Sequence, residues 1–177
     1  MPVFANTIER AESAIQAIDS MQADFIQIAS DGSSASGKLY LRRPFQMRID
    51  YEGSTPISLL ATRVWLHIDD PYERKVTSYP ISETPLALIL QKDVKLQGDD
   101  FTTSVQEAGG VTQIIMQRDT GEAAGTLVLE FDNNFRLRRW IIEDAVGVST
   151  AVTLQNEIYG VKLDNRLFAT PDYASDS

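Results

Sequence analysis

Apolar and polar residues alternate without interruption from residue 45 to residue 52. Successive side chains of a β-strand point to opposite faces, so this pattern predicts a strand with one apolar and one solvated face. The apolar positions are Phe45, Met47, Ile49 and Tyr51. Pro44 stands where the strand begins, which is tolerated because a proline at a strand's first residue removes no ladder hydrogen bond. We therefore expect two strands to meet at a bend that carries Arg42 and Arg43 beside an apolar wall, as an apolar ligand cavity requires.

The period of two continues through most of the chain after Met21. Turn signals rich in Gly, Asn and Asp separate the alternating stretches, because these residues accept a positive φ at low cost. Short strands at this spacing are typical of one antiparallel sheet or barrel. Besides 45–51, the expected strands are residues 23–29, 38–42, 59–61, 64–68, 75–79, 101–106, 111–117, 125–131, 135–143 and 149–158.

Near the start of the chain the period changes and predicts a helix. Asn6 and Glu9 have the spacing of a capping box, in which each side chain satisfies a free backbone amide. An apolar stripe with intervals of three and four residues follows, as on one face of an amphipathic helix. The stripe consists of Ile8, Ala11, Ile15 and Ile18. The pattern leaves open whether this helix packs on the sheet as a core element or acts as a lid.

A second helix is expected over residues 84–92, in the middle of the strand pattern. Thr84 suits the N-cap, and Pro85 suits the first helical position, where a missing amide is no loss. The apolar run over residues 86–90 leaves no polar face, so this helix must be covered on most sides. Two interpretations stay open: a plug that closes the end of a barrel, or a movable lid over an apolar cavity.

Composition limits the partners of the chain. A length of 177 residues suits one domain over residues 1–177. The net charge of -9 excludes nucleic acid as the main partner, since phosphate binding needs a basic face. No apolar run approaches the roughly 18 residues of a spanning helix, and no segment has the pattern of a signal peptide. The absence of cysteine excludes disulfides, thiolate metal sites and a lipidated N-terminal cysteine.

The sequence predicts neither an enzyme nor a metal or other cofactor. His67 is the only histidine, and one histidine cannot form a multi-histidine metal site. The acidic pairs at 69–70 and 99–100 lie beside turns, where we expect solvated carboxylates rather than an acid–base pair. Three arginines gather on the expected strand 135–143, where we expect them to pair with carboxylates of neighbouring strands. They are Arg136, Arg138 and Arg139.

Several short motifs stand in an order that resembles the periplasmic outer-membrane lipoprotein carrier family, LolA, over most of the chain. After the amphipathic first helix they are Ala23-Asp24-Phe25, Gly37-x-Leu39-x-Leu41-x-Arg43-Pro44, Met47-Arg48-x-Asp50-Tyr51, Trp65-Leu66-His67-Ile68-Asp69-Asp70-Pro71, Thr84-Pro85-Leu86 and Phe168-Ala169-Thr170-Pro171. Each motif alone is weak. Their order and spacing together make the resemblance specific.

The resemblance implies a mainly β fold with a few helices (α+β), an incomplete, strongly curved antiparallel β-barrel covered by a helical lid. It implies a periplasmic carrier that takes acylated lipoproteins from an inner-membrane ABC transporter and passes them to an outer-membrane receptor. In that family the arginine before the junction proline helps to hold the lid shut. This role maps onto Arg43, with Arg42 as a second candidate. We expect a monomer in the periplasm, after removal of a signal peptide.

An apolar cavity under the lid would shield the acyl chains of the cargo. The residues that we expect to line the cavity or form the lid are Phe25, Leu39, Leu41, Phe45, Met47, Ile49, Leu59, Trp65, Pro85, Leu86, Leu88, Ile89 and Leu90. Two other functions stay open on the same fold. One is a carrier or sensor of free lipids or fatty acids, and the other is a non-catalytic envelope interaction domain with a filled core.

Overall fold

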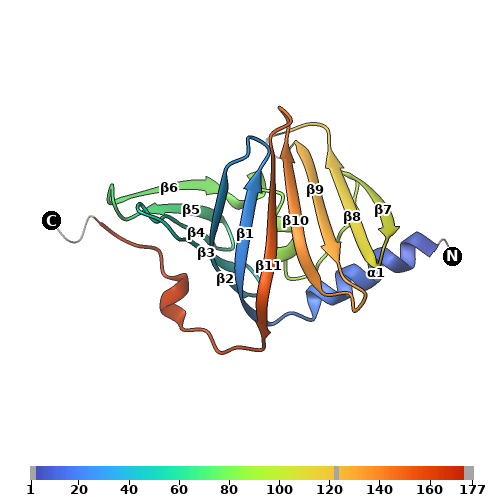
Figure 1. The fold of residues 1–177 in the computed structure, drawn as a ribbon, viewed down its shortest axis with the longest axis horizontal. Coiled ribbons are helices and arrows are strands. Elements are labelled where there is room, and N and C mark those ends of the chain that lie inside the picture. Colours follow the sequence, from blue (N-terminus) through green and yellow to red (C-terminus); the bar gives the residue numbers. More distant parts are fainter. Residues whose placement is uncertain (1–2, 122–123, 174–177) are drawn as a thin grey trace.

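The computed structural model describes residues 3–121 and 124–173. Its strands form one 11-stranded antiparallel sheet in the order β6-β5-β4-β3-β2-β1-β11-β10-β9-β8-β7 (Figure 1), which confirms the expected fold class. The strands are β1 (Ser20–Ala29), β2 (Ser34–Arg42), β3 (Gln46–Tyr51), β4 (Ser58–Ala61), β5 (Trp65–Asp70), β6 (Lys75–Pro80), β7 (Thr102–Ala108), β8 (Val111–Arg118), β9 (Gly125–Phe131), β10 (Leu137–Asp144) and β11 (Ser149–Tyr159). The helical elements are α1 (Val3–Gln16), η1 (Ile81–Glu83), α2 (Ala87–Leu90) and η2 (Asn165–Phe168).

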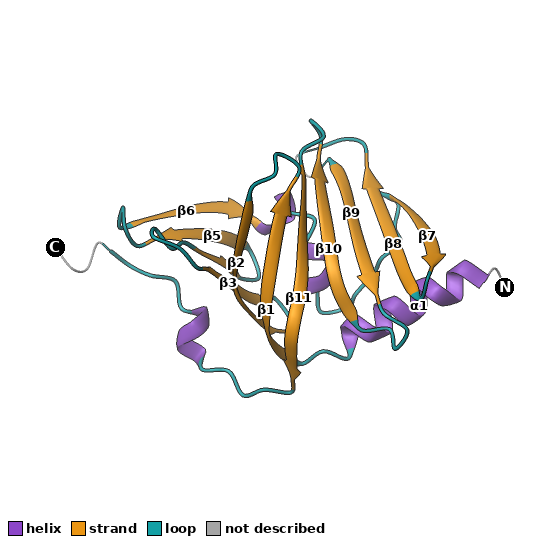
Figure 2. Ribbon diagram, in the orientation of Figure 1, coloured by secondary structure: helices purple, strands orange, loops and turns teal. Residues whose placement is uncertain are grey.

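The sheet is curved and stays open. β1 pairs with β11 in the middle of the sheet, while β6 and β7 form its two free edges. This pairing joins β1–β6 and β7–β11 into one surface. Figure 2 shows α1, η1 and α2 on one side of that surface. We call this side the inner face and the opposite side the outer face.

Alternation along the strands sends the apolar side chains to the inner face. In β1, Met21, Ala23 and Phe25 are almost fully buried, and the residues between them are more exposed. The same pattern in β3 buries Met47 and Ile49. Burial of a large apolar side chain contributes about 1.5–3 kcal/mol, so these inward rows fix both the register and the face of each strand.

The first helix is part of the core. Its predicted stripe is buried, with Ile8, Ala11 and Ile15 packed in the same cluster as the inner face of the sheet. The capping box at Asn6 and Glu9 was a wrong prediction, because α1 already begins at Val3. Residues on the N-terminal side continue the helix, so Asn6 occupies an interior position instead of a cap.

Residues 84–91, which we call the lid segment, form a shorter and more irregular element than predicted. Of the helix expected over residues 84–92, only the single turn α2 forms; η1 precedes this range, and Thr84 at its start is extended. The amides of Ala87 and Leu88 donate to the carbonyl oxygens three residues earlier, at Thr84 (3.2 Å) and Pro85 (3.1 Å). Such i→i+3 bonds give a tighter, shorter turn than an α-helix. Gln91 is extended and ends the segment.

The C-terminal segment crosses the outer face, an arrangement that the strand pattern did not predict. After β11 the chain turns at Gly160, and its η2 helix packs against β3. Leu163 and Phe168 bury themselves against Leu60, and Tyr40 packs at the edge of this second cluster. The sheet is therefore covered on both faces near β2–β4.

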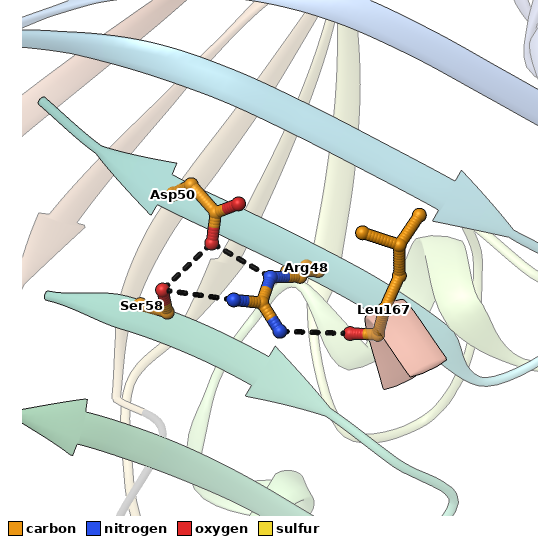
Figure 3. Close-up of polar contacts among 4 residues, drawn as sticks. All are labelled: Arg48, Asp50, Ser58 and Leu167. Carbon is orange, nitrogen blue, oxygen red and sulfur yellow. Dashed lines mark hydrogen bonds and ion pairs between the residues drawn. The ribbon is translucent and has the colours of Figure 1, made fainter. Parts of the chain in front are cut away.

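Arg48 ties this segment to the sheet, as Figure 3 shows. It donates from Nη1 to the carbonyl oxygen of Leu167 (3.0 Å) and from Nε to Oδ1 of Asp50 (2.7 Å). Its Nη2 also reaches the hydroxyl of Ser58 (3.4 Å), which itself donates to Asp50 (2.6 Å). The guanidinium thus links β3, β4 and the C-terminal segment through one connected set of polar contacts.

Candidate functional site

An apolar cavity of about 260 Å³ lies between the inner face of the sheet and the lid segment. Its lining is Gln27, Met47, Ile49, Tyr51, Leu59, Ala61, Leu66, Ile81, Thr84, Leu86, Leu90, Trp140, Ile142, Thr150 and Val152. Most of these side chains are hydrocarbon, so the cavity suits an apolar guest. Its volume falls below the roughly 300–1,000 Å³ of typical small-molecule sites. The lid as seen here therefore leaves too little room for a long acyl chain.

Five of the expected residues line this cavity: Met47, Ile49, Leu59, Leu86 and Leu90. Four others, Phe25, Leu39, Leu41 and Ile89, are buried in the surrounding core. Met47 is flexible and polarizable, which suits a wall that must adapt to guests of different shape. The inner rows of β3 and β4 thus supply one wall of the cavity, and the lid segment supplies the opposite wall.

The structure places Phe45 and Trp65 outside the cavity, which corrects the expected lining. Phe45 precedes β3 in the turn, with φ 77, and this left-handed backbone takes its ring out of the strand's alternation. Its ring lies under the guanidinium of Arg63, 5.3 Å from the ring centroid. Trp65 is the neighbour of the inward-facing Leu66 in β5, so it points to the outer face and is 45% exposed.

A second hollow of about 580 Å³ lies on the other side of the lid segment. Pro85 and Leu88, two of the expected lid residues, face this hollow. Its other walls mix apolar residues such as Met116 and Leu127 with the polar Arg118 and a pair of exposed aspartates, 99 and 100. Thr84 borders both hollows, so the lid segment is the partition between them. Movement of this segment would join the two spaces.

The central strands contribute lining residues that the sequence pattern did not single out. Trp140 and Ile142 of β10 and Val152 of β11 reach the cavity because β11 pairs with β1. Their period of two was visible in the sequence. The order in which the strands pair was not visible in the sequence, and it is this order that brings Trp140, Ile142 and Val152 to the cavity.

A hydrogen-bonded pair of polar side chains lies in the cavity wall. The Tyr51 hydroxyl donates to Oε1 of Gln27 (2.7 Å), and the ring packs edge-on against Phe25 with centroids 5.4 Å apart. Burial raises the pKa of the Tyr51 hydroxyl, so it stays protonated and remains a donor at neutral pH. Apart from this pair, Thr84 and Thr150 are the polar residues of a lining that is otherwise apolar.

Arg43 joins the lid segment to α1 and the sheet. Its Nε donates to the carbonyl oxygen of Ile89 (2.9 Å), and its Nη2 donates to that of Gln91 (2.5 Å). Its Nη1 also reaches the carbonyl oxygen of Gln16 at the end of α1 (3.3 Å). Partial burial lowers the pKa of this guanidinium, an effect that Asp19 opposes. The side chain therefore holds both the last turn of the lid and the residue after it.

Arg42 points the other way. Its Nη1 donates to Oδ1 of Asn165 (2.8 Å) and to the carbonyl oxygen of Leu163 (3.3 Å). Its guanidinium also stacks on Phe168, 4.5 Å from the ring centroid. Arg42 thus contacts the C-terminal segment, and of the two arginines only Arg43 is bonded to the described lid residues.

The remaining polar residues of interest have structural contacts. His67 is paired with Ser78 on β6 (Nδ1 to Oγ, 2.7 Å). The expectation of a solvated carboxylate is wrong for Asp69, because this residue is 7% exposed and accepts a hydrogen bond from Tyr173 (2.6 Å).

Within residues 3–121 and 124–173 no group of three His, Cys, Asp or Glu residues is placed to hold a metal ion. No helix in this same part of the chain is long and apolar enough to cross a membrane.

The predicted arginine pairing holds for two of the three arginines. Arg138 pairs with Glu157 of β11 (2.5 Å), and Arg139 pairs with Glu130 of β9 (3.5 Å). Arg136 lies before β10 and stacks on Tyr159, 5.7 Å from the ring centroid, so it does not share the strand with Arg138 as expected. A register shift between Leu137 and Arg139 explains why both of the paired arginines reach carboxylates.

Comparison with known proteins places this geometry in a family. The family described as "Outer membrane lipoprotein carrier protein LolA" matches residues 16–171. An outer-membrane lipoprotein carrier protein of Azotobacter vinelandii is 27% identical over 178 residues, which cover 92% of this chain and 81% of the relative. A LolA superfamily protein from Nitrosomonas europaea has a similar fold, with a TM-score of 0.54 and 9% identity over 94% of this chain and 97% of that one. A DUF1329 family protein from Desulfovibrio piger is similar at a TM-score of 0.56 and 13% identity, over 95% and 97% of the two chains.

Proposed function

Because the chain belongs to the LolA family of outer-membrane lipoprotein carriers, we propose that it shields the acyl chains of lipoproteins in its apolar cavity and carries them across the periplasm. The observation that carries this proposal is the apolar cavity between the sheet and a lid segment that is anchored by the buried Ile89 and Leu90 and by hydrogen bonds from Arg43. A structural domain with a filled core would have no use for such a space. The cavity therefore favours a carrier over an interaction domain.

The energetics of an acyl chain explain why a lid is needed. Each methylene removed from water contributes about 0.8 kcal/mol, so a long chain cannot cross an aqueous compartment unshielded. The interior of a bilayer stabilises the acyl chain by a similar free energy. A carrier must therefore bind the chain about as strongly as the membrane does and still release it. A cavity of about 260 Å³ that joins the neighbouring hollow when the lid segment moves would meet both requirements. It shields the chains when the lid segment has moved aside, and it returns to a compact state after release.

We assign the role of latch to Arg43. Its hydrogen bonds to the carbonyl oxygens of Ile89 and Gln91 hold the lid segment against the sheet. A hydrogen bond from a charged donor contributes about 1.5–3 kcal/mol, so two such bonds form a weak latch that a long acyl chain can displace. The lid thus stays shut without cargo and opens when cargo enters.

The proposed partners follow from the family. They are an inner-membrane ABC transporter that loads the cargo and an outer-membrane receptor that accepts it. We further propose that the protein acts in the periplasm as one domain and as a monomer, since a one-to-one carrier needs no symmetry. No catalytic step is part of this proposal, because the cargo is moved without a change in its covalent bonds.

Native mass spectrometry of the protein purified from its host tests the proposal. We expect a population that carries one acylated lipoprotein or its acylated N-terminal peptide. Diacyl lipids or fatty acids as the only guests would contradict lipoprotein carriage and favour the second function, a carrier or sensor of free lipids. Protein that binds neither acylated peptides nor lipids would contradict both.

A further inference from the structure

Three apolar side chains stand exposed where the β1–β2 and β10–β11 turns meet. Val146 is 84% exposed, Ile28 is 56% exposed and Val148 is 49% exposed. Val146 is the most exposed large apolar side chain among the described residues. We call Ile28, Val146 and Val148 the rim cluster. A single exposed apolar side chain is ordinary, but here Ile28 at the end of β1 lies near Val146 and Val148 of the β10–β11 turn, because β1 pairs with β11.

The turn that carries two of these residues is ordered by its own hydrogen bonds. Oδ1 of Asp144 accepts from the amides of Val146 and Val148 (both 3.0 Å), and the Gly147 amide donates to the Asp144 carbonyl oxygen (3.1 Å). Gly147 has φ 87, a conformation that disfavours any residue with a Cβ. The turn therefore holds its valines outward and does not fold them onto the sheet.

The two turns form one projecting unit. The amide of Ser30 donates to the carbonyl oxygen of Ser149 (2.8 Å), and the amide of Ser149 donates back to the Ser30 hydroxyl (3.2 Å). Figure 1 shows the β10–β11 turn as the point that extends farthest at the top of the view. A projecting tip of this kind suits a soft or hollow surface better than a flat, rigid one.

The rim cluster stands at the end of the cavity. Gln27, Ile142 and Thr150 line the cavity, and they lie within one or two residues of the ends of β1, β10 and β11. Ile28 follows Gln27 directly and points to the opposite face. The apolar tip and the apolar cavity are thus separated by only one layer of the sheet.

The charge around the cluster restricts what can bind there. The turns carry Asp31, Glu143 and Asp144, while residues 23–37 and 140–150 contain no lysine or arginine. The chain as a whole has a net charge of -9. Anionic headgroups would be repelled, since attraction to them depends on nearby basic residues.

We propose that the rim cluster is a membrane-contact site that inserts between the headgroups of a zwitterionic bilayer surface. Insertion removes the three side chains from water. The free energy gained by this transfer depends on the apolar area buried and not on charge. It would also bring the end of the cavity to the bilayer, so that an acyl chain could move between them with little exposure to water. The inference applies to any acyl carrier with this geometry and does not depend on which cargo is bound.

Vesicle flotation with phosphatidylcholine vesicles tests the site. We expect the wild-type protein to float with the vesicles. We expect the double variant Val146→Ser, Val148→Ser to partition about tenfold less, because two exposed valines no longer contribute apolar area to the contact. Val111→Ser is the matched control, since Val111 is 41% exposed at the β7–β8 turn. The melting temperatures of all three proteins show whether they fold alike.

A fluorescence measurement provides a second readout. The chain has no cysteine, so Val146→Cys gives a single labelling position for a polarity-sensitive dye. We expect a blue shift with phosphatidylcholine vesicles for this label and none for a label at Val111→Cys. Absence of flotation by the wild type, equal flotation of the double variant, or binding only to phosphatidylglycerol vesicles would overturn the proposal. Loss of cargo handover in the double variant without vesicle binding would assign the cluster to a protein partner and would equally overturn it.

Discussion

Adjacent arginines have different partners at the junction of β2 and β3. Arg42 is the last residue of β2 and contacts the C-terminal segment, whereas Arg43 lies in the turn and contacts the lid segment. The sequence motif narrowed the latch to these two residues. It could not separate them, because the partners are backbone carbonyl oxygens whose positions depend on how distant segments pack.

Replacement of the latch should loosen the lid. In Arg43→Leu the carbonyl oxygens of Ile89 and Gln91 lose a charged donor. We expect the free energy that favours the closed lid to fall by about 2 kcal/mol, less than two full hydrogen bonds, because water can replace the donor at these partly exposed sites. Amide exchange in residues 84–91 should then be roughly 30-fold faster. Hydrogen–deuterium exchange followed by mass spectrometry measures this directly.

Arg42→Leu is the matched control for that measurement. It removes the same charge one residue earlier, and we expect it to accelerate exchange near Leu163 and Asn165 while the lid keeps its protection. Equal protection of residues 84–91 in Arg43→Leu and wild type would contradict the latch. The same would follow if Arg42→Leu loosened the lid as much as Arg43→Leu does.

At the scale of elements, the strands were predictable from the sequence. Two of the elements that cover the faces of the sheet, α2 and the C-terminal segment, were not. Alternation located all of the strands, with differences mainly at their ends, such as β1 beginning at Ser20 instead of residue 23. The short α2 and the C-terminal segment follow from packing that no local pattern encodes. Leu163 and Phe168, for instance, are buried only because Leu60 faces outward from β4.

The C-terminal segment should contribute to stability through Arg48. In Arg48→Ala, Asp50 loses its ion pair and the Leu167 carbonyl oxygen loses its donor, which we expect to lower the free energy of unfolding by about 1–2 kcal/mol. Urea unfolding monitored by circular dichroism measures the change. The side chains of Arg48 and Asp50 are only partly exposed, at 22% and 34%, so solvent screens their ion pair incompletely.

Lys38→Ala supplies the comparison for an exposed ion pair. Lys38 pairs with Asp24 at 2.9 Å, but both side chains are more than 40% exposed, at 47% and 41%. We expect a smaller loss of stability than in Arg48→Ala. An Arg48→Ala variant that is as stable as Lys38→Ala would show that the C-terminal segment is not held by this guanidinium.

At the scale of the whole molecule, the proposed function depends on a sheet that curves without closing. The pairing of β1 with β11 brings Trp140, Ile142 and Val152 opposite the lid. The sequence predicted the lining from β3, β4 and the lid, because those residues lie on one motif-rich stretch. It did not predict the lining from β10 and β11, because strand order in a sheet of this size is a tertiary property.

The two hollows give the molecule a way to change the volume that is available to a guest. The cavity of about 260 Å³ and its neighbour of about 580 Å³ share the lid segment as a partition. A movement of the lid segment would therefore join the apolar cavity to a larger hollow, whose walls mix apolar residues with Arg118 and two aspartates. The proposed carrier function requires both a closed and an open lid.

Photo-crosslinking with an acylated lipopeptide tests the central claim most directly. The probe carries a diazirine within its acyl chain, and the same peptide with the diazirine on an unacylated side chain serves as the control. We expect the crosslinked fragments to contain Met47, Leu59, Leu86 and Leu90, which face each other across the cavity. Crosslinks confined to the outer face, or no more crosslinking within the cavity than the control with the side-chain diazirine gives, would contradict an acyl chain held beneath the lid.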